Sequence, residues 1–217
     1  MSKIKLKKIL TKQNKPIVLP LLALFFAVLY LGSGAISNQF GSLLPLLEWE
    51  KLVPFLPWSI WIYMVFYPIY LGLCIVVLLK NNNHEILNKT IYGFILLTIL
   101  SCFIFVLLPI SYPRMNYPLS LDDNLTNLIF RLVRKTDTPS NCLPSLHVGL
   151  CFYFAWCTLK VSKKFFNFGI FSSIIISIST LTTKQHYFYD IIAGFLLATL
   201  IFWLIDRYTK ITGIFSK

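Results

Sequence analysis

The chain has 217 residues, of which 57% are hydrophobic and only 13% are charged, and its formal net charge is +12. Its apolar residues fall into runs of roughly 17 to 25, which is long enough to cross the hydrocarbon core of a bilayer and excludes an ordinary soluble domain. The five cysteines show no Cys-x-x-Cys motif and no spacing typical of zinc, so we expect neither a disulfide framework nor a metal site.

The apolar runs predict an all-α, polytopic membrane protein, built as a six-transmembrane-helix bundle with short interfacial helices on the outer side. The first run follows a basic start but has full span length and no clean cleavage site after it, which favours a retained helix over a signal peptide. The chain should therefore consist of a basic cytoplasmic N-terminus (1–16), a transmembrane domain (17–206) and a cytoplasmic tail (207–217). The six expected spans cover residues 17–36, 60–79, 91–110, 145–161, 166–183 and 189–206.

The position of the basic residues decides how the net charge is interpreted. With six spans and the N-terminus inside, the inner segments carry 14 basic and 2 acidic residues, and the outer segments carry six of each. The whole positive excess then lies on the cytoplasmic side, as the positive-inside rule requires. We therefore expect a protein of the lipid bilayer that has no nucleic-acid partner.

Two outer segments predict structure that does not span the membrane. Residues 37–59 mix leucines and tryptophans with three prolines, a composition typical of a segment in the membrane interface. Residues 121–135 place leucines on one helical face, with acidic residues early and basic residues late, as the helix dipole favours. This second pattern predicts a short amphipathic helix on the outer surface.

Two histidines stand just before apolar runs, His147 in Pro-Ser-Leu-His and His186 four residues before Asp190. Ionisable groups are costly at the mouth of a membrane helix and are seldom kept there without a role. On a helix, His186 and Asp190 share a face, so the carboxylate could fix one ring nitrogen and leave the other free to attack. The pair by itself could also be a histidine and an aspartate that merely satisfy each other.

The surroundings of His147 favour the catalytic interpretation. Pro144 suits the first turn of a helix that Ser140 or Asn141 could cap, which would leave the first-turn N–H groups from Ser145 onward free to bind phosphate. The fourth and sixth spans both begin on the outer side. Topology therefore places His147, His186 and Asp190 at one face of the membrane.

Two basic residues on the same side are candidate phosphate ligands. Lys184 precedes His186 by two residues, and Arg114 follows Pro113 at the outer end of the third span. A phosphate needs cationic partners for its oxygens, although such residues can also extend to lipid headgroups at the interface.

These motifs resemble those of a known family. Pro144 to His147, and Lys-Gln-His-Tyr-x-x-Asp from Lys184 to Asp190, are similar to the second and third signature motifs of the type 2 phosphatidic acid phosphatase superfamily, with spellings closest to its inositol-phosphorylceramide-synthase-like branch. The resemblance covers roughly residues 90–206. It departs from the family where Ser-Thr at 179–180 replaces Ser-Arg, and where Pro-Arg at 113–114 replaces Arg-Pro, with a leucine at the usual lysine position.

The resemblance implies a two-step mechanism that needs no metal and no cofactor. His186 would attack phosphorus and form a phosphohistidine, Asp190 would orient it, and His147 would protonate the leaving oxygen and later activate the acceptor. The resemblance further implies phosphate-binding roles for three residues, Ser145, Lys184 and Arg114.

We therefore expect an integral-membrane lipid phosphatase that hydrolyses a lipid phosphomonoester or pyrophosphate. Its partners would be a phosphorylated membrane lipid and the bilayer. Short loops favour a bacterial inner membrane, with both termini cytoplasmic and the site periplasmic. A lipid phosphotransferase with a polyol or sugar acceptor is the main alternative. A non-enzymatic transporter is disfavoured, because the spans show almost no polar groups near the midplane.

Overall fold

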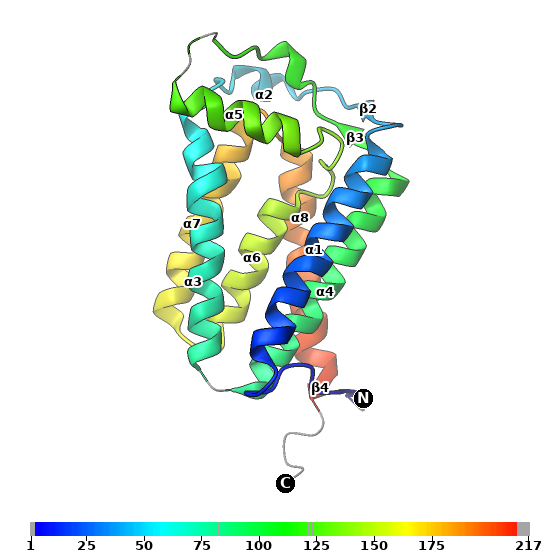
Figure 1. Ribbon diagram of the computed structural model, residues 1–217, viewed down its shortest axis with the longest axis vertical. Helices are drawn as coiled ribbons and strands as arrows, with labels where there is room; N and C mark the ends of the chain where they lie inside the picture. The colour runs from blue at the N-terminus through cyan, green and yellow to red at the C-terminus, as the bar shows by residue number, and fades with distance from the viewer. Residues whose placement is uncertain (1–2, 82, 121, 123, 212–217) are drawn as a thin grey trace.

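The computed structural model describes residues 3–211 except residues 82, 121 and 123, and it is predominantly helical (Figure 1). Three short helical turns precede or connect the main helices, namely η1 (Pro57–Ser59), η2 (Ile62–Phe66) and η3 (Arg114–Asn116). The α-helices are α1 (Lys15–Ser37), α2 (Glu48–Leu52), α3 (Tyr67–Lys80), α4 (His84–Leu107), α5 (Leu125–Thr136), α6 (Leu146–Leu159), α7 (Lys163–Thr182) and α8 (Phe188–Tyr208).

Within the described residues, five helical segments are long and apolar enough to cross a membrane, which confirms five of the six predicted spans in outline. They are Lys15–Ser37, Pro57–Lys80, His84–Leu107, Lys163–Thr182 and Phe188–Tyr208. The remaining predicted span, 145–161, corresponds to α6, which has 14 residues. A helix of that length is about 21 Å long, against a hydrocarbon core of about 30 Å. The count of six spans therefore stays a prediction.

Helix α6 is the centre of the bundle. It packs against α3, α4, α7 and α8, and most of its side chains are buried. Small residues allow close approach: a Cβ at Gly169 of α7 would lie 3.1 Å from the Cβ of Ala155 on α6. Because other helices surround it, α6 does not need to match the thickness of the bilayer by itself.

The start of α4 lies earlier than the prediction. The sequence suggested residue 91, whereas the helix begins at His84, because the Asn83 side chain accepts hydrogen bonds from the backbone N–H of Glu85 and Ile86. The polar first turns of α4 also bind the N-terminal segment of the chain. Asn88 Oδ1 accepts from the N–H of Leu10, at 2.7 Å, and so fixes the N-terminal segment against α4.

The two ends of the bundle differ. At one end, strand β1 (Ile4–Leu6) pairs in parallel with β4 (Thr209–Ile211), which brings the two described termini together (Figure 1). At the opposite end, β2 (Ser42–Leu43) pairs in parallel with β3 (Ile110–Ser111), and α2 and α5 cover the helix ends. We call these the β4 end and the α5 end.

Helix α5 lies across the α5 end and confirms a helix within the predicted segment 121–135. Residues 121 and 123 of that segment lie outside the described part of the chain. The helix starts at Leu125 because Asn124 accepts a hydrogen bond from the N–H of Asn127 at 2.9 Å. Phe130 and Val133 are buried, whereas the predicted leucine stripe is largely exposed. The location of this stripe in a membrane interface stays a prediction.

Candidate active site

The structure brings the two histidines of the sequence motifs together at the α5 end. Their ring centroids lie 5.8 Å apart with an interplanar angle of 62°. His147 lies in the first turn of α6, and His186 lies in the loop that leads into α8. The two elements are packed closely at this point, because Gly194 of α8 leaves room for the carbonyl oxygen of Ser145. A Cβ at Gly194 would collide with this oxygen.

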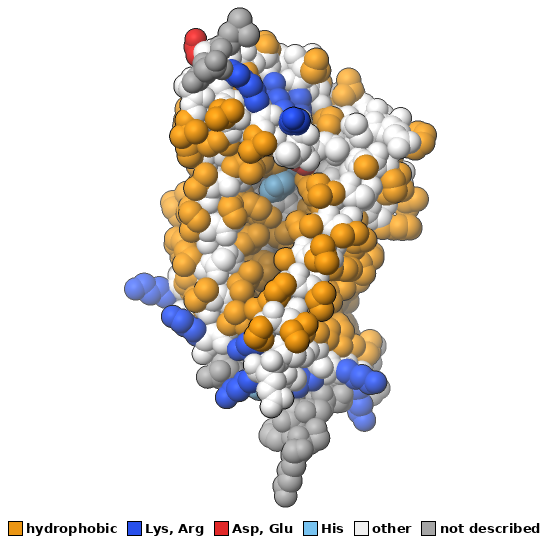
Figure 2. Space-filling view, in the orientation of Figure 1, with side chains coloured by type: hydrophobic (Ala, Val, Ile, Leu, Met, Phe, Trp, Pro, Cys, Tyr) orange, Lys and Arg blue, Asp and Glu red, His pale blue; other side chains and the backbone are white. Residues whose placement is uncertain are grey.

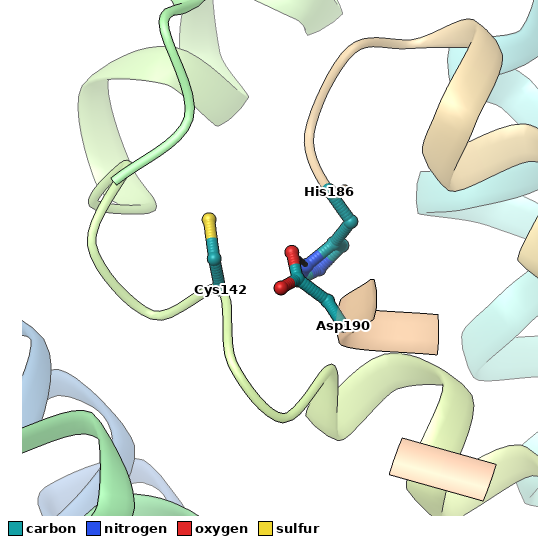
Figure 3. Close-up of side chains that lie close together, drawn as sticks. All are labelled: Cys142, His186 and Asp190. Carbon is teal, nitrogen blue, oxygen red and sulfur yellow. Dashed lines mark hydrogen bonds and ion pairs between the residues drawn. The ribbon is translucent and has the colours of Figure 1, made fainter. Parts of the chain in front are cut away.

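His186 and Asp190 form the expected contact by a different route. His186 precedes α8 and is not part of the helix, so the two residues do not share a helical face. Asp190 instead lies in the first turn of α8, where its Oδ2 accepts a hydrogen bond from the N–H of Tyr187 at 2.8 Å. The same oxygen lies 3.3 Å from His186 Nδ1 (Figure 3). Both side chains are almost fully buried, so this contact can fix the imidazole.

His147 is surrounded by tyrosine rings. The rings of Tyr63 and Tyr67 lie 4.6 and 4.9 Å from its centroid, and the ring of Tyr30 meets it edge-on at 6.4 Å. Tyr63 belongs to η2, a π-helical turn, and its hydroxyl oxygen lies 3.4 Å from His147 Nδ1. Such turns re-aim side chains and are frequent at functional sites.

Asp137 connects this tyrosine cluster to Arg114. Its carboxylate accepts hydrogen bonds from Tyr30 at 2.7 Å and from Tyr63 at 3.5 Å. Arg114 binds the same residue twice, with Nη1 2.7 Å from the Asp137 carbonyl and Nη2 3.1 Å from Oδ2. The sequence indicated Arg114 as a candidate site residue, but it did not indicate these contacts. Asp137 belongs to no motif and is, in the sequence, only an acidic residue of an outer loop.

Ser145 is the N-cap of α6, which corrects the prediction that Ser140 or Asn141 caps this helix and that Pro144 lies in its first turn. Its Oγ accepts a hydrogen bond from the N–H of Val148 at 3.4 Å, and its own N–H donates to the Asp190 carbonyl at 2.9 Å. The helix therefore begins at Leu146, where first-turn N–H groups have no intrahelical acceptor. Ser145 is fully buried, and it ties α6 directly to α8.

Lys184 lies at the α5 end, but its ammonium group is directed to α2. Its Nζ donates to the carbonyl oxygen of Val53 at 2.6 Å and lies 3.5 Å from that of Glu50. Burial lowers the pKa of this ammonium group, an effect that the Glu50 carboxylate opposes. The backbone of Lys184 has a φ of 56°, in the left-handed region that non-glycine residues seldom adopt. Its role as a phosphate ligand stays a prediction.

Glu50 gives the outer loop a second attachment to the site. Its Oε1 accepts a hydrogen bond from the N–H of Phe188, the first residue of α8, at 2.7 Å. Its Oε2 accepts from the N–H of Leu47 at 2.8 Å. Lys184 and Glu50 together therefore hold α2 against the loop that carries His186.

A family model described as the PAP2 superfamily matches residues 45–204 of the chain. The matched range includes both histidines, Asp190, Arg114 and Asp137. No curated protein and no solved structure matches the chain significantly.

Proposed function

The chain belongs to the PAP2 superfamily, and from this premise we propose that it is an integral-membrane lipid phosphatase. Membership suggests phosphatase or phosphotransferase activity, and the apolar helices suggest a membrane protein. The substrate in this proposal is a lipid that carries a phosphomonoester or a pyrophosphate. The observation that carries the proposal is the arrangement of His186, oriented by buried Asp190, beside His147.

In the first step, the free ring nitrogen of His186 attacks phosphorus. A nitrogen–phosphorus bond forms while the bond from phosphorus to the lipid oxygen breaks, and His147 donates a proton to that oxygen. In the second step, water gives a proton to His147 and attacks phosphorus, which releases inorganic phosphate and restores His186. Asp190 stabilises the positive charge that develops on His186.

We propose that Tyr63 and Asp137 support His147 as the acid. In the protonated imidazole, the Nδ1–H group donates to the Tyr63 oxygen, and the Tyr63 hydroxyl donates to Asp137 Oδ2. This orientation leaves the Nε2–H group for the leaving oxygen. The two distances, 3.4 and 3.5 Å, are long for hydrogen bonds, and catalytic contacts commonly shorten when substrate binds.

The phosphate cradle in this proposal consists of the first-turn N–H groups of α6, the Ser145 hydroxyl, Arg114 and Lys184. Arg114 Nε is buried and has no hydrogen-bond partner among the described residues, so it is a free donor beside the Asp137 network. Lys184 would have to leave the carbonyl oxygen of Val53 to contribute. Replacing each residue by methionine should therefore raise KM more for Arg114 than for Lys184.

A lateral cavity supports a lipid as the substrate. It has a volume of about 400 Å³, lies between α1, α3, α4 and α6, and is lined almost entirely by apolar side chains, including Phe26, Leu71 and Phe94. Figure 2 shows a hollow with hydrophobic walls on this face and a histidine side chain above it. Tyr67 lines the cavity and also contacts His147. We propose that the hydrocarbon chain of the substrate occupies this cavity while its phosphate lies at the histidines.

The alternative is a lipid phosphotransferase, in which a sugar or polyol hydroxyl replaces water in the second step. The Ser-Leu-His and Lys-Gln-His motifs favour this activity, because they are similar to those of the inositol-phosphorylceramide-synthase-like branch. The hydrolase needs only water as the acceptor, and we therefore keep it as the first proposal. Adding polyol or sugar acceptors to the assay and analysing the lipid products separates the two activities.

We propose a bacterial inner membrane as the location, with residues 17–206 as the membrane domain and the segments 1–16 and 207–217 in the cytoplasm. The site at the α5 end would then face the periplasm. The meeting of β1 and β4 supports a common side for both termini. Residues 212–217 of the tail lie outside the described part of the chain. Labelling of single cysteines at both ends of the bundle by an impermeant reagent in intact cells tests this orientation.

The decisive experiment compares purified wild-type protein with a His186→Ala variant for phosphate release from a panel of lipid phosphates. We expect release by the wild type and none by the variant. Equal rates for the two proteins would refute the mechanism. Leu107→Ala, at an exposed position near the end of α4, serves as the control.

A further inference from the structure

Three buried side chains with metal-binding atoms converge next to the two histidines. Cys142, from the loop that precedes α6, lies beside His186 and Asp190 at the start of α8 (Figure 3). One donor atom from each residue lies within 4.8 Å of the others. The three residues are only 1%, 4% and 0% exposed, so an ion bound between them would be shielded from bulk solvent.

Asp190 has an unused acceptor in this cluster. Its Oδ2 binds Tyr187 and His186, but its Oδ1 is buried and has no hydrogen-bond partner among the described residues. In Figure 3 the carboxylate oxygens lie toward Cys142. A buried carboxylate oxygen without a partner has lost its hydration without a compensating hydrogen bond. This oxygen therefore offers a ready ligand position.

The thiol of Cys142 is directed by neighbouring carbonyls rather than by the carboxylate. Its sulfur lies 3.0 Å from the Pro139 carbonyl oxygen and 3.6 Å from that of Gln185. These carbonyls accept the S–H proton and leave the sulfur lone pairs available. No disulfide competes for the sulfur, because all five cysteines are free.

We propose that Cys142, His186 and Asp190 bind a thiophilic divalent cation, Zn²⁺ in particular. One sulfur, one nitrogen and one oxygen ligand form a donor set that Zn²⁺ accepts, with bonds of about 2.0–2.3 Å. On binding, the Cys142 thiol loses its proton to solvent, and the thiolate and the carboxylate together neutralise the dication. A neutral assembly suits a buried site, where an uncompensated charge would be costly.

The donor atoms must approach one another for the ion to bind. With those bond lengths, the ligands of a tetrahedral ion lie less than about 4 Å apart, whereas the three donor atoms lie within 4.8 Å of one another, so any pair near that limit must close. Cys142 lies in a loop, whereas Asp190 is fixed in the first turn of α8, so the movement falls to the thiol. A water molecule or a phosphate oxygen would take the fourth position.

The consequence for activity rests on the proposed phosphohistidine mechanism. The ion occupies the nucleophile His186 and the carboxylate that orients it, so Zn²⁺ acts as a reversible inhibitor and not as a catalytic metal. Cys142 has no place in the proposed reaction. A Cys142→Ser variant should therefore keep its basal activity and lose only the sensitivity to Zn²⁺.

The first test measures binding without reference to catalysis. Purified protein, treated with a chelator and then with ZnCl₂, is freed of excess metal, and its zinc content is determined. We expect one Zn²⁺ per chain for the wild type and for Cys102→Ser, a control at another buried cysteine, and none for Cys142→Ser. With Co²⁺ as the probe, a thiolate-to-metal absorption band should appear in the wild type and in Cys102→Ser, but not in Cys142→Ser. Equal zinc contents in the wild type and Cys142→Ser would overturn the proposal.

The second test measures inhibition of phosphate release over a range of free Zn²⁺. The half-inhibitory concentration should rise at least about tenfold in Cys142→Ser, with an unchanged rate in the presence of chelator. Identical inhibition curves would overturn the inhibitory role. If no lipid phosphate is hydrolysed even with chelator, the proposed function fails, while the zinc contents still decide whether the site exists.

Discussion

The hydroxyl group of Tyr63 is the sharpest probe of how His147 works. The Tyr63→Phe substitution removes the oxygen that lies 3.4 Å from His147 Nδ1 and 3.5 Å from Asp137 Oδ2, and it keeps the ring against the imidazole. Asp137 retains its hydrogen bonds from Arg114 and Tyr30. The folded state should therefore lose only about 0.5–1.5 kcal/mol.

The expected effect on the rate is larger. A hydrogen bond to a charged group contributes about 1.5–3 kcal/mol, which corresponds to roughly a 10- to 150-fold change in kcat. The long distances in the structure favour the lower end of this range, about tenfold. KM should hardly change, because Tyr63 does not contact the proposed phosphate cradle. The high-pH limb of the kcat profile should move to lower pH, because the imidazolium that donates the proton loses a hydrogen-bond acceptor.

The assay is phosphate release from a lipid phosphate in mixed micelles, measured as kcat and KM across a range of pH. Tyr70→Phe is the matched control, since Tyr70 follows in the same helical segment and its hydroxyl donates to the Cys151 carbonyl at 3.0 Å, away from His147. The reasoning is refuted if Tyr63→Phe and Tyr70→Phe have the same kcat and the same high-pH limb.

Three further predictions concern the nucleophile, the helix contact and the cysteine. His186→Ala should abolish the alkali-stable, acid-labile phosphoprotein that rapid quenching with labelled substrate traps in the wild type; labelling that persists would exclude His186. Gly194→Ala should lower the free energy of unfolding by about 1–3 kcal/mol through overpacking, and with it the thermal midpoint, because the new Cβ would collide with the Ser145 carbonyl oxygen. Gly32→Ala, at a position with open space, should leave the thermal midpoint unchanged. Burial raises the pKa of the Cys142 thiol well above its ordinary value, so maleimide should modify it at neutral pH only after denaturation; rapid modification of the folded protein, mapped by mass spectrometry, would contradict this.

Local sequence patterns predicted the helices well where the whole helix is apolar. Five of the six predicted spans correspond to long apolar helices. The expected span 91–110 leaves out the first turns of α4, which begins at His84, because those turns are polar. In the structure Asn83 caps the helix and Asn88 binds the backbone of the N-terminal segment. Hydropathy does not indicate such a polar first turn, whereas the capping residue does.

In the candidate site, too, the sequence indicated some residues and not others. His147, His186 and Asp190 stood out because ionisable residues next to apolar runs are rare, and the structure places them together. Their partners could not be predicted, since Tyr63 resembles any aromatic residue of an apolar span and Asp137 resembles any acidic residue of an outer segment. Only the packing of η2 and the loop after α5 against α6 brings them to His147.

The amino-acid sequence alone indicated the helical membrane class, the two histidine motifs and the superfamily to which they belong. These follow from local composition and from short spacings, which the chain carries whatever its fold. Only the packed fold shows which groups face each histidine, that Lys184 binds the carbonyl oxygen of Val53 at the end of α2, and that Cys142 lies beside Asp190. These facts depend on how separate helices pack, and close packing is set by small residues and buried polar contacts that no single segment contains.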